Sequence, residues 1–135
     1  MDRIRISSDL LAAIAGHAAR VWPNECCGLL VGAGDRIDEV VATRNALAHP
    51  SRYQIDPQEH IDTNRRLRGT SRSVVGAYHS HPRTDAVPSP RDLQEAYYPD
   101  FVWLIVSLRK GTPEYRIYGI ARGAATELEL IVDSS

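Results

Sequence analysis

The feature that most constrains this sequence is a proline-rich stretch in its second half. Prolines at positions 82, 88 and 90 lie within nine residues of one another. Proline donates no backbone N–H and restricts the residue before it, so this stretch can neither pair in a sheet nor lie inside a helix. The segment before it, 73–81, is therefore predicted to be a strand that ends at His81, and a loop must follow.

The end of the proline-rich stretch predicts the start of a helix. Ser89 stands at an N-cap position, Pro90 at the first helical position and Asp92 in the first turn. A serine cap, an early proline and an early acid each suit a helix N-terminus. We expect a short helix that runs to about Tyr97.

The rest of the chain predicts a mixed sheet flanked by helices, an α/β class of the α+β type. Ile4 and Ile6 alternate with polar residues, as in a half-buried edge strand, and an apolar stripe then predicts a helix that ends at Pro23 and covers the sheet. The stripe consists of Leu10, Ile14, Ala18 and Val21. Further along the chain, Gly34 and Asp35 suit a hairpin turn. The other expected elements are a helix over 57–67 and strands over 27–32, 36–43, 101–108, 114–120 and 127–132.

Length and charge limit the function classes. A chain of 135 residues suits one domain, 1–135. A formal net charge of -1 gives no field that would hold a nucleic acid, and no apolar run is long enough to cross a membrane. Two adjacent cysteines form neither a disulfide framework nor a C-x-x-C clip, and no export signal is visible, so a cytoplasmic location is expected.

Several other residues are expected to serve packing rather than chemistry. Cys26 and Cys27 have no neighbouring base in the sequence that would activate a thiolate, so both are predicted to be buried. Four aromatic residues are expected first in the core, with one or two lining a groove. They are Trp22, Tyr97, Tyr98 and Trp103.

The strongest chemical signal is the pair His79 and His81. Side chains two residues apart on a strand point to the same face, so both imidazoles can reach one ion. Zinc readily takes a carboxylate as a third ligand and leaves a fourth position for water in catalytic sites. Asp92, across the proline loop, is the candidate third ligand.

A water at such a metal also needs a proton acceptor, and Glu25 is our candidate. It comes directly before the apolar strand 27–32, where a sheet end could hold its side chain. Two plainer interpretations stay open at this point. Glu25 could simply solvate the start of a strand, and Ser89 could be only a helix cap.

The combined pattern resembles the JAMM, or MPN-plus, zinc metalloproteases. Its parts are Glu25 before CGLLVG, then His79-Ser80-His81-Pro82, Ser89 and Asp92. The resemblance implies a cytidine-deaminase-like JAMM/MPN fold, Zn²⁺ bound by the two histidines and Asp92, water activation by Glu25, and help to the oxyanion from Ser89.

The resemblance also implies a substrate. The family cleaves amide or isopeptide bonds at the C-terminus of ubiquitin-like proteins, and small bacterial members act on sulfur carriers that end in Gly-Gly. We expect Gly76, Tyr78 and the proline loop to frame a slot where the tail pairs with a sheet edge. The sequence leaves the oligomeric state open, a homodimer included.

Two other functions compete with this one. A non-catalytic MPN-type binding module of the same fold is the alternative, and retention of all five motif residues disfavours it. A nucleobase deaminase would need H-x-E followed by P-C-x-x-C, and neither occurs.

Overall fold

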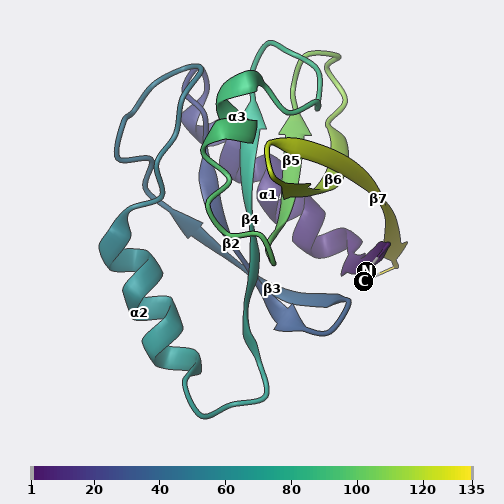
Figure 1. Cartoon of the computed structure of the whole chain (residues 1–135). Coiled ribbons are helices and arrows are strands. Elements are labelled where there is room, and N and C mark those ends of the chain that lie inside the picture. The colour runs from purple at the N-terminus through teal and green to yellow at the C-terminus, as the bar shows by residue number, and fades with distance from the viewer. Residues whose placement is uncertain (1, 135) are drawn as a thin grey trace.

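The structure is a computed structural model that describes residues 2–134. Within that range it contains three helices and seven strands (Figure 1). In chain order they are β1 (Arg3–Ser7), α1 (Ser8–Val21), β2 (Cys27–Ala33), β3 (Arg36–Thr43), α2 (Pro57–Leu67), β4 (Ser73–His81), α3 (Pro90–Gln94), β5 (Val102–Ser107), β6 (Glu114–Ala121) and β7 (Ala124–Asp133).

The seven strands of the described range form one mixed sheet that closes on itself. Their order is β1-β3-β2-β4-β5-β6-β7, with β1 joining β7. The pairs β4 with β5, β1 with β7 and β1 with β3 are parallel, and the other neighbours are antiparallel. The mixed sheet is as predicted. The prediction that β1 is an edge strand is wrong. The twisted sheet curls until β1 pairs with β3 on one side and with β7 on the other.

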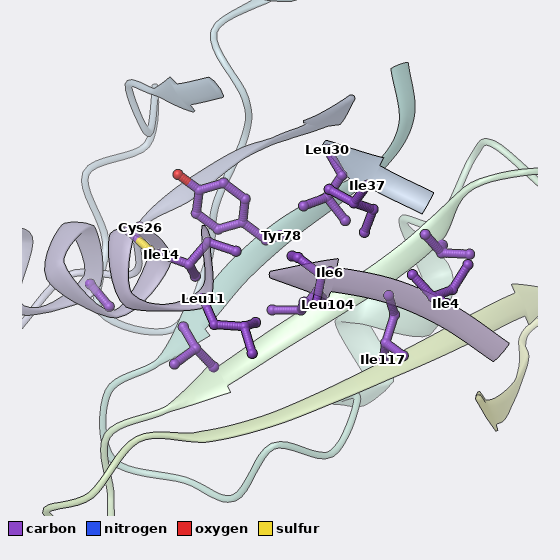
Figure 2. Close-up of a cluster of buried hydrophobic side chains, with 13 residues drawn as sticks. Ile4, Ile6, Leu11, Ile14, Cys26, Leu30, Ile37, Tyr78, Leu104 and Ile117 are labelled. Atoms are coloured by element: carbon purple, nitrogen blue, oxygen red, sulfur yellow. The ribbon is translucent and has the colours of Figure 1, made fainter. Parts of the chain in front are cut away.

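Helix α1 packs against the sheet and fills the larger core (Figure 2). Ser7 caps it by accepting a hydrogen bond from the backbone N of Leu10 at 3.2 Å. Leu11 and Ile14 point from the helix toward Ile6 and Leu104 of the strands. The buried stripe is shifted slightly from the predicted one, because Leu11 is buried and Leu10 lies at its margin.

The opposite face of β4 and β5 carries the smaller core, and this face positions the candidate site. Ala77 and Trp103 of the two strands pack there with Ala86 of the proline loop, and Leu93 of α3 packs against the same cluster. Side chains alternate along a strand, so His79 points to the same side as Ala77. The proline loop and α3 therefore lie over the histidine side of β4.

The aromatic residues are divided between core and surface. Trp103 is buried, whereas Trp22, Tyr97 and Tyr98 are 49%, 75% and 48% exposed, so the core prediction is wrong for Trp22. Tyr97 and Tyr98 line a groove together with Trp103, as was expected for one or two of the four. They lie beyond α3, which ends at Gln94 rather than near Tyr97.

No helix among the described residues is both long and apolar enough to cross a bilayer.

Candidate metal centre

Two elements bring the three predicted ligands together. His79 and His81 are the last alternate residues of β4, and both are buried. Asp92 lies in the first turn of α3, where a capping box with Ser89 fixes it: the backbone N of Asp92 donates to Ser89 Oγ at 3.1 Å, and the backbone N of Ser89 donates to Asp92 Oδ2 at 2.9 Å. A strand and a helix cap thus hold the ligands on rigid backbone.

The potential ligand atoms form a small triangle. His79 Nε2 lies 3.2 Å from His81 Nε2 and 3.2 Å from Asp92 Oδ2, and His81 Nε2 lies 3.1 Å from the same oxygen. These three residues make up a candidate metal site. Ligands of a tetrahedral zinc ion at 2.0–2.1 Å would be about 3.3 Å apart, which fits these separations.

The hydrogen bonding of His81 adds a chemical reason for a cation. Its Nδ1 lies 2.7 Å from the carbonyl oxygen of Asp85, which can only accept, so Nδ1 carries a proton. In the neutral ring the Nε2 atom then presents a lone pair toward the carboxylate of Asp92. Lone pairs on neighbouring atoms repel each other unless a cation lies between them. The donor set therefore fits a bound divalent metal ion.

The electrostatics of Asp92 suit a ligand that stays ionised. Burial alone would raise the pKa of this carboxyl group, but the adjacent His79 and His81 outweigh burial and hold its pKa well below the usual range. Asp92 therefore supplies a negative charge directly at the triangle of ligand atoms.

Glu25 lies two residues before the start of β2, where Cys27 pairs with His79 and Cys26 bonds to Ser80, so its backbone is next to the end of β4 that carries the histidines. Its backbone N donates to the carbonyl oxygen of His49 at 2.9 Å, and its side chain is 5% exposed. Burial raises the pKa of Glu25 to about 8; His81 opposes that rise and Asp92 adds to it, so the carboxyl group is within electrostatic reach of the cluster. Its Oε1 has no hydrogen-bond partner in the described chain. A buried carboxyl group with a free oxygen is suited to exchanging a proton with a reactant.

Ser89 caps α3 and still keeps a hydroxyl hydrogen that it can donate. As a cap, its oxygen accepts a hydrogen bond from the backbone N of Asp92. Accepting uses a lone pair and leaves the hydroxyl hydrogen free to donate. Capping therefore does not compete with donation to an oxyanion.

The two cysteines are buried, as predicted. Burial raises the pKa of Cys26 to about 12 and that of Cys27 to about 11, so neither thiol is ionised near neutral pH. The backbone of Cys26 instead links the segment that carries Glu25 to β4, which carries the two histidines. Its backbone N donates to Ser80 Oγ at 2.8 Å, and its carbonyl oxygen accepts from the backbone N of Ser80 at 3.1 Å.

A groove leads to the site over the floor of β4. It has a volume of about 410 Å³, and the Tyr53 ring lies at its inner end, stacked on His79 with ring centroids 4.4 Å apart. The predicted slot at Gly76 and Tyr78 is wrong, because β4 pairs with β2 on one side and β5 on the other and offers no free edge. The groove is instead lined by side chains, among them Tyr53, His60, Ala77, Tyr98, Phe101 and Trp103.

Asn45 is a supporting residue whose role the sequence pattern did not reveal. Its Nδ2 donates to the carbonyl oxygens of Glu25 and Arg52, both at 3.0 Å, and its Oδ1 accepts from the backbone N of Leu47 and of Gln54. One side chain thus ties the loop after β3 to the backbone of Glu25.

We expect Asn45→Ala to destabilise the protein by about 2 kcal/mol, because it leaves several backbone groups without partners. Thermal unfolding of the metal-free protein measures this. Asn64→Ala is the matched control, because Asn64 is exposed on α2 and should be replaceable at almost no cost. Equal melting temperatures for the two variants would contradict the role of Asn45.

Comparison with known proteins places this arrangement in a family. A family model described as prokaryotic homologs of the JAB domain matches residues 7–118. The chain belongs to this family. CysO-cysteine peptidase of Mycobacterium tuberculosis is 37% identical over 125 residues, which cover 90% of this chain and 86% of that protein.

Other relatives of this JAB-family chain agree with the assignment. Desampylase of Haloferax volcanii is 35% identical over 113 residues, covering 78% of this chain and 81% of that protein. The crystal structure of a JAB1/MPN domain protein from Archaeoglobus fulgidus matches with a TM-score of 0.63 at 25% identity, covering 95% of this chain and 99% of that one. The JAMM resemblance and the JAB/MPN fold expected from the sequence are confirmed.

Proposed function

We propose that this JAB-family chain is a zinc-dependent peptidase that cleaves the amide bond after the C-terminal Gly-Gly of a ubiquitin-like or sulfur-carrier protein. The observation that carries the proposal is the convergence of His79, His81 and Asp92 on one point, with donor atoms 3.1–3.2 Å apart. The relative from M. tuberculosis is by name a peptidase for CysO-cysteine, which supports a carrier conjugate as substrate. We expect residues 1–135 to act as one cytoplasmic domain.

In this mechanism zinc, held by His79, His81 and Asp92, would polarise the scissile carbonyl and lower the pKa of a water molecule. Glu25 in its ionised form, which a neighbouring cation would favour, takes the proton from the attacking water and then gives it to the departing nitrogen. Its free, buried Oε1 suits that exchange. The hydroxyl group of Ser89 donates a hydrogen bond to the carbonyl oxygen as negative charge develops on it.

We place the carrier tail in the groove over β4. Tyr53 lines the groove and stacks on His79, so a tail that reaches the metal must pass this ring, which favours residues without side chains. The buried floor of Ala77 and Trp103 offers apolar contact on the way. A Gly-Gly ending is therefore the tail that fits best.

A cleavage assay tests the proposal. The protein is loaded with one equivalent of zinc and incubated with a CysO-type carrier extended by one cysteine after its Gly-Gly, and mass spectrometry follows the carrier. We expect loss of one residue, which stops when a chelator removes the metal. Zinc binding without hydrolysis of any Gly-Gly conjugate would contradict a peptidase and favour the non-catalytic binding module.

Ser89→Ala should lower kcat about 100-fold, because one oxyanion donor is typically worth about 3 kcal/mol. Zinc content should not change, since the Asp92 carboxylate keeps its backbone donor at residue 89. Ser7→Ala is the control: Ser7 caps α1 in the same way but lies away from the site, so it should lose stability without losing kcat. If Ser89→Ala keeps full kcat, its role is capping alone.

A further inference from the structure

An exposed pair of side chains, Trp22 and Arg83, lies outside the lining of the groove. The guanidinium carbon of Arg83 lies 5.1 Å from the centroid of the Trp22 ring, and Trp22 is half exposed. Trp22 comes three residues before Glu25, and Arg83 comes two residues after His81. One member of the pair is therefore close in sequence to Glu25, and the other is close to His81.

The positive charge of Arg83 has no acidic partner within the described chain. Two other arginines near it in sequence or in its loop do have partners: Arg91 pairs with Glu95 at 3.4 Å, and Arg109 pairs with Asp85 at 2.8 Å. Asp85 is the acidic residue closest to Arg83 in sequence, and it is already paired with Arg109. The guanidinium group of Arg83 lies over the Trp22 ring. Its N–H donors lie in the plane of the guanidinium group and remain free to bind an anion.

The proposed mechanism gives this anion a place in the substrate. Glu25 returns a proton to the departing nitrogen, so the leaving group must lie on the Glu25 side of the metal. The carrier tail occupies the opposite side, in the groove next to His79. Arg83 therefore faces the leaving group rather than the carrier.

We propose that Arg83, oriented by Trp22, binds the free α-carboxylate of a single amino acid that is joined to the carrier through its α-amine. In such a substrate the carboxylate is two bonds from the departing nitrogen, and an arginine can bind it through two parallel hydrogen bonds. A lysine of a protein, joined through its side-chain amine, has no free carboxylate near the cleaved bond. The inference rests on the proposed peptidase function and narrows its substrate to amino-acid conjugates.

Two substrates test this: a CysO-type carrier extended by cysteine and the same carrier extended by cysteinamide. The leaving amines differ in basicity, so the informative quantity is how the ratio of kcat/KM values changes on substitution. Arg83→Gln should lower the ratio of acid to amide about tenfold, mainly through KM for the acid, and Arg83→Lys should restore part of it. Arg52→Gln removes the same charge from the groove side and should leave the ratio unchanged.

Binding gives a second readout that does not need turnover. With the Glu25→Gln protein, the acid conjugate should bind about tenfold more weakly once Arg83→Gln is added, and the amide should bind equally well in both. An unchanged ratio and unchanged binding in Arg83→Gln, with both conjugates cleaved, would overturn the role of Arg83 and leave the peptidase intact. Failure to cleave either conjugate would overturn the proposed function itself, and this inference with it.

Discussion

Glu25→Gln is expected to lower kcat about 10⁴-fold while the protein still binds one zinc ion. The amide has nearly the same shape as the carboxyl group but cannot accept the proton of the attacking water, and general base catalysis contributes up to about 10⁴-fold. Glu25 makes no side-chain hydrogen bond through its Oε1, so a neutral amide should fit without unfolding the site. Steady-state kinetics and elemental analysis of the same sample measure the two effects.

Glu127→Gln provides the charge-matched control for Glu25. Glu127 lies on β7 and pairs with Arg116 on the surface, and it does not line the groove, so its loss should change kcat less than twofold. If Glu25→Gln keeps more than a tenth of the wild-type kcat, another group moves the proton and the assigned role of Glu25 is wrong.

The second large effect is expected from Asp92→Asn. The asparagine oxygen can still accept from the backbone N of Ser89, so the helix cap should survive, but the negative charge at the metal is lost. Loss of an outer hydrogen bond around a metal ligand typically costs roughly 10–100-fold in affinity, and loss of the charged ligand itself should cost more. Competition with a zinc chelator of known affinity measures the change, and hydrolysis at limiting zinc should fall with it.

Asp85→Asn is the matched control for Asp92. Asp85 belongs to the loop that precedes α3, but only its backbone oxygen contacts His81, and its side chain is paired with Arg109. Zinc affinity should therefore stay within about twofold of the wild-type value. A comparable loss of zinc affinity in both variants would mean that the affinity depends on the total negative charge near the site and not on direct ligation by Asp92.

Most of the fold could be predicted from local patterns. Pro82 ended a strand, Ser89 began a helix, and Gly34 with Asp35 formed the hairpin turn, because each depends on backbone preferences of neighbouring residues. Closure of the sheet could not be predicted. It depends on β1 meeting β7 from the far end of the chain, and nothing local to Ile4 or Ile6 distinguishes an edge strand from one that pairs on both sides.

In the candidate site, too, local patterns predicted some features, and contacts between distant parts of the chain decided the others. The shared face of His79 and His81 follows from strand geometry, and the cap geometry places Asp92. The burial of Glu25 and the four hydrogen bonds of Asn45 depend on how a long loop folds back on β2, which no local pattern specifies. The sequence predicts that one or two of four aromatic residues line a groove but does not specify which, since a groove wall and a core can have the same aromatic composition.

The zinc K-edge absorption spectrum of the purified protein tests the central claim most directly. We predict a first shell of nitrogen and oxygen at about 2.0–2.1 Å, with the outer-shell scattering of two imidazole rings and no sulfur. A sulfur shell at about 2.3 Å, or protein that holds no zinc at all, would contradict a centre built from His79, His81 and Asp92.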